Sequence, residues 1–238
     1  MSNAERFIKA YNTLDYALRT QYNFKRGMPF SDCIRRSVVL NSVIRKYEDE
    51  LIDYGRLRNA IIHSGKDDDE IIAEPKLEVV EKLEHIVQIV TTPPRVYDTV
   101  CRKDVVCVDS DVSVKETVGL IAKTGYSNIP VYSNGELVGV ANGQKIINVL
   151  GKKIEENVDL NAFVEETKIG EIVNQNDSNN FYAIKPLSLT VSDALNLFYE
   201  NRKLLVILIT PHGNYLEMPI GIISVTDILD INKIIENY

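Results

Sequence analysis

Apolar residues recur at every third or fourth position through roughly the first 90 residues of the chain, which is the spacing of amphipathic helices. The first apolar face consists of Phe7, Tyr11, Leu14 and Leu18. Further helices are predicted over residues 33–47, with Ser31 as the N-cap, and over residues 57–63 and 79–90. The pattern therefore predicts an all-α helical bundle over residues 1–92.

After residue 94 the pattern changes, and short runs of β-branched residues alternate with helical segments. Two segments repeat the order strand–helix–strand–strand–helix. The landmarks of the first copy are VKETVGL from Val114, IPVY from Ile129, LVGV from Leu137 and IINVL from Ile146. Those of the second copy are VSDALNL from Val191, LVIL from Leu205, PIGI from Pro219 and ILDI from Ile228. In the first copy, the run Ser-Asn-Gly at 133–135 predicts a hairpin turn.

These repeated motifs resemble the CBS domain family. The resemblance rests on SVKET from Ser113, TVSDA from Thr190 and, above all, GIISVTDIL at 221–229. It implies two βαββα units that pack sheet to sheet as a Bateman module, and clefts between them that bind AMP, ADP, ATP, S-adenosylmethionine or a related molecule. The corresponding domains are a linker at 93–104, unit one at 105–150, an acidic and polar connecting segment at 151–180, and unit two at 181–238.

The second unit supplies the main candidates for ligand binding, namely Ser224, Thr226 and Asp227. Ser224 is expected to cap the helix that follows, and the N-terminus of a helix favours phosphate. Asp227, in the first turn, is expected to accept hydrogen bonds from ribose hydroxyls. The alternative is that its carboxylate only stabilises the positive end of the helix dipole.

Further candidates follow from the same resemblance, which places an adenine ring near Tyr182, Ala183 and Ile184. Arg202 and Lys203 precede a predicted strand and either meet phosphates or form a solvated helix end. In the first unit Lys145 stands where the second has Asp227, and a lysine has no acceptor for ribose hydroxyls. We therefore expect that one site has lost ribose recognition, while Lys145 could still contact a phosphate.

The segment LRNAIIH at 57–63 resembles the HEPN superfamily, whose members are metal-independent endoribonucleases that act as dimers, or inactive relatives. The resemblance makes Arg58, Asn59 and His63 candidate catalytic residues. His63 suits proton transfer and Arg58 suits the phosphoryl oxygens, while Asn59 and His63 would share one helix face. The alternative is structural: His63 caps the helix end, and Arg58 pairs with Asp53 or Glu50.

The charge of the chain is −7 overall but is unevenly spread. Residues 1–66 hold 12 Lys and Arg against 7 Asp and Glu, a net of +5, whereas residues 96–238 hold 12 against 19, a net of −7. A polyanion such as RNA is therefore a plausible partner for the first part only, although the asymmetry is also compatible with no such partner.

The three cysteines, Cys33, Cys101 and Cys107, are far apart and form no zinc or iron–sulfur spacing. We expect free thiols in a cytoplasmic protein, no metal site and no catalytic cofactor. No run of about 18 apolar residues is present, so no membrane span is expected, and the amphipathic N-terminus is unlike a signal peptide.

The leading hypothesis is a regulatory protein of α+β, multidomain architecture that senses an adenine nucleotide through its CBS pair and signals through the HEPN-like domain. One alternative is a ligand-controlled endoribonuclease of the toxin or defence type. The other is a non-catalytic module that dimerises or binds a partner. A homodimer or higher oligomer is expected in each case, because a helical domain of about 90 residues buries only part of its apolar surface alone.

Overall fold

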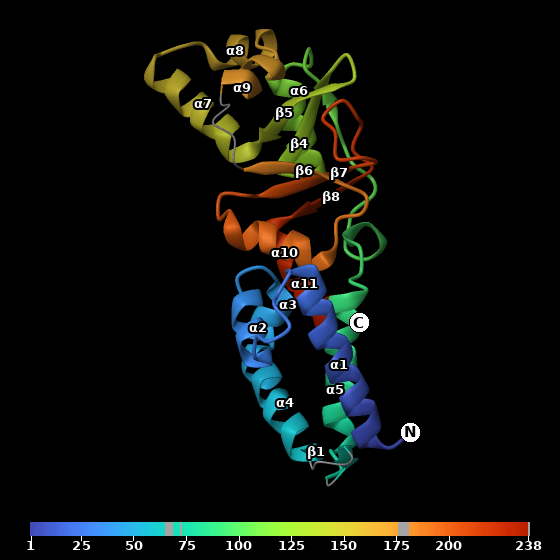
Figure 1. Ribbon diagram of the computed structural model, residues 1–238. Coiled ribbons are helices and arrows are strands. Elements are labelled where there is room, and N and C mark those ends of the chain that lie inside the picture. Colours follow the sequence, from blue (N-terminus) through green and yellow to red (C-terminus); the bar gives the residue numbers. More distant parts are fainter. Residues whose placement is uncertain (65–68, 72, 176–180, 238) are drawn as a thin grey trace. The chain divides into compact units, whose positions relative to one another are not determined.

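The computed structural model describes residues 1–64, 69–71, 73–175 and 181–237 (Figure 1). The chain divides into two compact units. The helical unit comprises residues 1–95, 190–200 and 228–238, and the sheet unit comprises residues 96–189 and 201–227. The domain boundaries predicted from the sequence keep each copy of the repeat whole. In the structure, the second copy is divided, because residues 190–200 and 228–238 belong to the helical unit and residues 201–227 to the sheet unit.

Five N-terminal helices form most of the helical unit. They are α1 (Asn3–Gln21), α2 (Phe30–Ser37), α3 (Ser42–Lys46), α4 (Glu48–Ile61) and α5 (Leu77–Thr91). Ser2 starts α1 with a capping box, since its side chain accepts from the Glu5 N–H and the Glu5 carboxylate accepts from the Ser2 N–H. Their fully buried large side chains include Phe7, Leu14, Leu18, Ile34, Leu51 and Leu83. The predicted apolar face of the first helix is therefore confirmed at three of its four positions, and Tyr11 is half-buried.

Several details of the helical prediction are wrong. The single helix expected over residues 33–47 is divided between α2 and α3, because the side chain of Asn41 accepts from the N–H groups of Val43 and Ile44 and so caps α3. The helix expected over residues 57–63 is the end of α4, which stops at Ile61. The chain continues as β1 (Ile62–Ser64), which pairs antiparallel with β2 (Asp69–Ile71), so the N-terminal segment is not all-α.

Helices α10 (Val191–Glu200) and α11 (Ile228–Asn237) come from the second repeat but complete the helical unit. Val191, Leu195 and Phe198 of α10 and Ile231 and Ile235 of α11 are buried. The side-chain amide of Asn196 donates to the Leu40 carbonyl at 3.1 Å, and Lys46 forms an ion pair with Glu236 at 2.7 Å. The N-terminal helices thus share one unit with two helices that begin 100 or more positions after the N-terminal helices end.

The sheet unit contains two three-stranded sheets of the same topology. Its elements are β3 (Val108–Asp109), α6 (Val114–Thr124), β4 (Asn128–Ser133), β5 (Glu136–Asn142), α7 (Gly143–Glu155), α8 (Leu160–Glu166), α9 (Ile169–Gln175), β6 (Tyr182–Pro186), β7 (Val206–Thr210) and β8 (Gly221–Ser224), with short 3₁₀ turns at Val96–Asp98 and Val225–Asp227. In each sheet the first strand pairs parallel with the second, and the second pairs antiparallel with the third. With α10 and α11 included, both copies have the predicted order βαββα.

The predicted hairpin turn joins β4 and β5. Asn134 has φ 52° and Gly135 has φ 84°, so both central residues adopt the left-handed conformation that this type of tight hairpin requires. Asparagine and glycine adopt it at lower cost than other residues.

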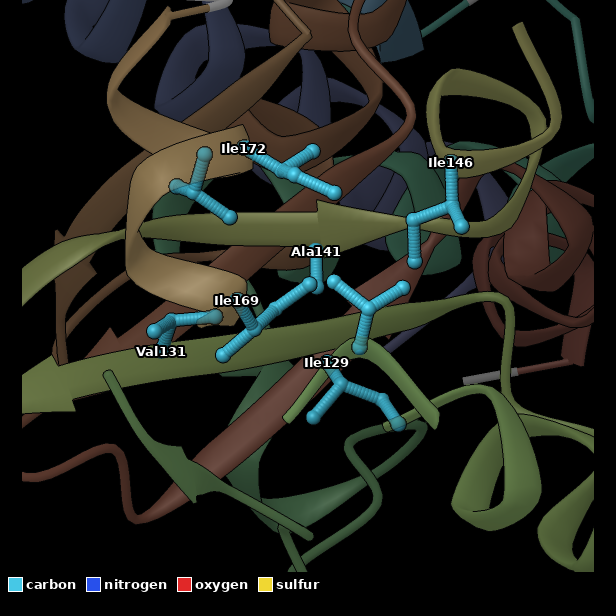
Figure 2. Close-up of a cluster of buried hydrophobic side chains, with 8 residues drawn as sticks. Ile129, Val131, Ala141, Ile146, Ile169 and Ile172 are labelled. Atoms are coloured by element: carbon cyan, nitrogen blue, oxygen red, sulfur yellow. The ribbon is translucent and has the colours of Figure 1, made fainter. Parts of the chain in front are cut away.

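Side chains of the first sheet form a buried hydrophobic cluster with side chains of neighbouring helices (Figure 2). The cluster includes Ile129 and Val131 of β4, Ala141 of β5, Ile146 of α7, and Ile169 and Ile172 of α9. A second cluster joins Val140 of β5 to Val206, Leu208 and Ile222 of the other sheet. The connecting segment at 151–180 is thus partly structural, because α9 supplies core residues.

None of the helices in the described part of the chain is both long enough and apolar enough to cross a membrane.

Candidate functional site

An open cleft of about 180 Å³ lies in the sheet unit. Its polar and aromatic lining consists of Arg102, Tyr126, Ser127, Asn128, Ser224 and Thr226. Ser127 and Asn128 lie where β4 begins, and Ser224 and Thr226 lie where β8 passes into the helical turn before α11. The cleft therefore lies at corresponding ends of strands from both sheets.

Arg102 is held at this cleft by its backbone. Its N–H donates to the Ile222 carbonyl at 3.1 Å, and the Ile222 N–H donates to the Arg102 carbonyl at 2.9 Å. Its guanidinium carbon lies 3.7 Å from the centroid of the Tyr126 ring, a cation–π contact. The predicted linker thus holds a cation at the edge of β8, where it contacts the aromatic ring of Tyr126.

Ser224 and Thr226 of the lining form a compact hydrogen-bonded group with Asp227. The Ser224 N–H donates to Asp227 Oδ2 at 2.6 Å, and its hydroxyl donates to the same oxygen at 2.9 Å. The hydroxyls of Ser224 and Thr226 lie 2.6 Å apart. Asp227 thus ties the end of β8 to the helical turn through Oδ2, and its other oxygen, Oδ1, makes no hydrogen bond to a described residue. In none of the described bonds does the Ser224 side chain accept a backbone N–H, so its role as an N-cap stays a prediction.

Gly221 explains how the chain before the first sheet approaches β8 so closely. A Cβ at position 221 would lie 2.3 Å from Cys101 Sγ, so a side chain there is excluded. Burial raises the pKa of the Cys101 thiol to about 11, and that of Cys107 to about 11 as well. Both remain protonated at neutral pH, so neither is activated as a thiolate nucleophile.

The equivalent space beside the first unit is almost filled. It has a volume of about 10 Å³ and is lined by residues that include Asn142, Lys145 and Phe181. Lys145 Nζ lies 3.8 Å from the centroid of the Phe181 ring, again a cation–π contact. Such a volume is about the minimum for one water molecule. Lys145 thus lines a space that is almost filled, whereas the related residue Asp227 is hydrogen-bonded to Ser224 in the lining of the open cleft.

The other predicted ligand residues are not brought into the open cleft. Tyr182, Ala183 and Ile184 lie on β6, where they pair with residues 206–208, and the Tyr182 ring packs against Phe181 with centroids 5.3 Å apart. Arg202 and Lys203 are exposed in the turn before β7. The described lining of the cleft includes none of these five residues.

The candidate residues of the helical unit are separated by the end of α4. Arg58 and Asn59 are on its last turn, with Arg58 Nη1 3.5 Å from Asn59 Oδ1. His63 follows on β1, and its side chain lies outside the described residues. The expectation that Asn59 and His63 share one helix face is therefore wrong. The suggested acidic partners of Arg58 pair elsewhere, Asp53 with Arg56 and Glu50 with Lys82.

Sequence reasoning missed Arg102, Tyr126, Ser127 and Asn128. The first lies in what was predicted to be a linker, and the others follow the helix-ending Gly125, which has φ 72°. A signal was nevertheless present, because Tyr126 and Ser127 lead directly into β4, which begins at Asn128, and polar residues at strand ends are candidates for a site. Among the described residues, no group of three or more His, Cys, Asp or Glu side chains could hold a metal ion.

Comparison with known families identifies one domain. The model of the family described as "CBS domain" matches residues 96–152, so this part of the chain is a CBS domain. The match covers the segment that carries Arg102 and all of the first βαββα copy. No curated protein matches the chain.

Solved structures of CBS domains are similar to the chain at low identity. A CBS domain protein from Streptococcus pneumoniae TIGR4 is 14% identical, with a TM-score of 0.42, over 58% of this chain and 82% of that one. The CBS domain of a bacterial CNNM/CorC family Mg2+ transporter, in complex with ATP, is 16% identical, with a TM-score of 0.44, over 63% and 94%. CBSX2 in complex with AMP is 18% identical, with a TM-score of 0.45, over 60% and 99%.

Proposed function

We propose that this protein is a regulatory nucleotide sensor whose open cleft binds AMP, ADP, ATP, S-adenosylmethionine or a related adenine-bearing ligand. The observation that carries the proposal is that one cleft, lined in part by the CBS domain, presents an aromatic ring, a guanidinium and hydroxyl groups, while the Asp227 carboxylate is hydrogen-bonded to Ser224 of the lining. A purine needs a stacking surface, a ribose needs hydrogen-bond acceptors and a phosphate needs cations or N–H donors. The cleft offers each of these.

The proposed binding mode uses different residues at the cleft for different parts of the ligand. Adenine stacks on the Tyr126 ring in place of the Arg102 guanidinium. The ribose hydroxyls donate to Asp227 Oδ1, while Oδ2 keeps its bonds from Ser224. Ligand sites usually measure about 300–1,000 Å³, so the cleft must enlarge, and the exposed Arg102 side chain is the group that moves and then meets a phosphate.

One ligand per chain is proposed. At the related position in the first unit, Lys145 lies over Phe181 and the remaining space is about 10 Å³. A ligand there would have to displace both side chains and would meet an ammonium group where ribose needs an acceptor.

The signal is proposed to pass through α11 into the helical unit. The cleft segment Ser224–Asp227 is followed directly by α11, whose Ile231 and Ile235 are buried in the core of the helical unit. There His85 Nε2 lies 3.1 Å from the Ile235 carbonyl oxygen, and Lys46 pairs with Glu236. A ligand that changes the segment Ser224–Asp227 would therefore act directly before the first residue of a helix in the helical unit.

An endoribonuclease is the second candidate function. Its support is the exposed last turn of α4, where the Arg58 guanidinium and the Asn59 amide lie together, within a segment of net charge +5. Incubation with labelled RNA in EDTA, with and without AMP, tests it, and His63→Ala and Arg58→Ala are the variants. Cleavage that both variants abolish would support the activity, and cleavage equal in all three proteins would assign it to a contaminant.

A homodimer is proposed because either output benefits from two copies of the small helical unit. Light scattering of the full chain at micromolar concentration, with and without AMP, measures it. A monomer under both conditions would contradict the proposal.

Calorimetric titration of the full chain with AMP, ADP, ATP and S-adenosylmethionine tests nucleotide sensing. We expect saturable binding of at least one of them with one site per chain. No binding by any of the four at millimolar concentration would refute the proposed function.

A further inference from the structure

A second cleft, of about 400 Å³, lies in the helical unit between α1, α2 and α4. Its volume is in the usual range for small-molecule sites, about 300–1,000 Å³. It shares no residue with the cleft of the sheet unit. Any ligand it takes is therefore separate from the proposed adenine ligand.

The apolar part of this cleft presents aromatic rings. Tyr11 and Phe30 are in contact, with ring centroids 4.5 Å apart, and Ile52 lies beside them in the lining. A Cβ on Gly55 would lie 3.2 Å from Phe30 Cδ1, so the glycine lets the ring lie close against α4. Burial, followed by the nearby Asp15 carboxylate, raises the pKa of Tyr11 to about 12, and its hydroxyl remains a neutral donor at physiological pH.

The polar part of the cleft is cationic. Both charged residues of its lining are arginines, Arg35 from α2 and Arg56 from α4, and Asn59 and Ser31 add an amide and a hydroxyl. Ser31 is inside α2, since Pro29 is the N-cap and makes no side-chain hydrogen bond, so the predicted capping role of Ser31 is wrong and its hydroxyl is not used for it.

The present partners of these arginines hold them weakly. Arg35 lies 3.4 Å from Asp32 and Arg56 lies 2.7 Å from Asp53, each within its own helix. The two arginine side chains are 60% and 77% exposed. Exposed ion pairs contribute little to stability, so a ligand with two negative charges can compete for both guanidinium groups.

We propose that this cleft binds a nucleoside monophosphate group, with its base against the Tyr11–Phe30 pair and its phosphate on Arg35 and Arg56. A nucleoside monophosphate combines a planar base with a phosphate dianion. It therefore matches both the aromatic and the cationic part of the lining, whereas a base or a phosphate alone would match only one of them. A free nucleotide and the phosphorylated end of an RNA strand share this chemistry. The inference does not rest on the adenine cleft, and it adds a site at which the helical unit itself recognises a ligand.

The experiment is calorimetric titration of the full chain with uridine 5′-monophosphate, uridine and 5′-phosphorylated hexauridylate. A uracil base is used so that the proposed adenine cleft contributes least. We expect the monophosphate to bind, and Arg35→Gln with Arg56→Gln to weaken it by about tenfold per arginine, since hydrogen bonds to charged groups are the strong ones. Uridine, which lacks the phosphate, should bind as weakly as the monophosphate binds the double variant.

Arg36→Gln is the matched control, because Arg36 is the exposed neighbour of Arg35 on α2 but lies outside the lining. Gly55→Ala changes no charge and should still weaken binding by displacing Phe30. Tighter binding of the hexauridylate than of the monophosphate identifies an RNA end as the ligand, and equal or weaker binding identifies a free nucleotide. Equal monophosphate affinity in wild type and the double variant overturns the proposal, as does equal affinity for uridine and its monophosphate.

Asp227→Ala separates this inference from the proposed function. If the second cleft is a site, this variant binds the uridine monophosphate as wild type does, even where it has lost AMP. Loss of uridine monophosphate binding in Asp227→Ala would assign that ligand to the sheet unit and overturn the inference alone.

Discussion

Replacement of Asp227 by alanine separates the ligand-binding role of this carboxylate from its structural role. In the unliganded protein Asp227 Oδ2 accepts from the N–H and the hydroxyl of Ser224. Alanine removes both bonds at the start of the turn that leads into α11. In the proposed complex it also removes the acceptor for the ribose hydroxyls. The variant should therefore unfold at a lower temperature without ligand, and it should also gain less stability than wild type when ligand is added.

The two losses differ in size. Removal of a helix-capping side chain costs about 0.5–2 kcal/mol, and each kcal/mol lowers the melting temperature of a chain of this length by about 2–4 °C. Loss of hydrogen bonds to a charged carboxylate, at about 1.5–3 kcal/mol, weakens binding by roughly 10- to 100-fold. At AMP equal to 100 times the wild-type Kd, ligand stabilises wild type by about 2.7 kcal/mol and the variant by only about 0.4–1.4 kcal/mol.

Thermal unfolding with and without AMP measures both quantities, and calorimetry at one temperature checks the affinity. Asp230→Ala is the matched control, because Asp230 is exposed on α11 and pairs only with Lys233 among the interactions described for it, at 2.9 Å. Its AMP response should equal that of wild type. A full AMP response in Asp227→Ala would show that the carboxylate serves the helix alone, and the ribose assignment would then be abandoned.

Three further expectations follow from other parts of the structure. Lys145→Ala should destabilise the protein by about 0.5–2 kcal/mol through loss of the contact with Phe181, and calorimetry should still count one nucleotide per chain. Two equal sites in wild type would contradict the proposed asymmetry. Ile172→Ala should cost about 2–5 kcal/mol in urea unfolding because Ile172 is a core residue, whereas a side chain in a mere connector would cost less than about 0.5 kcal/mol. The backbone N–H and the ring of His212 lower the pKa of Glu217 from 4.5 to about 2, so this carboxylate contributes stability above pH 4.5 that is lost as the pH falls towards 2. Wild type should therefore be less stable at pH 3 than at pH 5, and Glu217→Gln should reduce this difference in unfolding free energy. An unchanged difference in the variant would mean that the Glu217–His212 pair contributes nothing to stability.

The repeat, its strand order and the hairpin turn could be predicted because each depends on residues close in sequence. Alternating β-branched runs specify strands, and Asn134 with Gly135 specifies a left-handed turn regardless of what packs against it. Ser113 with Glu116 likewise specifies a helix start, and the structure has that capping box. At this level local preference and the final fold agree.

The remainder depends on contacts between distant residues. The connecting segment is polar in composition, so its core residues Ile169, Ile172 and Val173 were not predicted. Positions i, i+3 and i+4 lie on one face of a helix, and these three residues of α9 pack with the first sheet. The end of α4 at Ile61 is set by the pairing of Ile62 with Ile71, which no helix pattern contains. The role of Arg102 depends on Ile222, 120 positions later, and nothing in the composition of a linker indicates that pairing.

The direct passage from the cleft into α11 determines how large a ligand response can be. A ligand shifts an equilibrium only by the difference between its affinities for the two arrangements. Contacts that are equal in both, such as stacking on Tyr126, add affinity without adding signal. Ser224 and Asp227 are different, because the bonds between them define the first turn of the helical segment. A ribose that draws Asp227 away from Ser224 changes the start of α11, while Glu236, paired with Lys46, fixes its other end in the helical unit. A switch of 100-fold would need a difference of about 2.7 kcal/mol, which is within what these two charge-assisted bonds can supply. In the proposed binding mode, the residue that accepts from the ribose is therefore also the residue through which binding would become a signal.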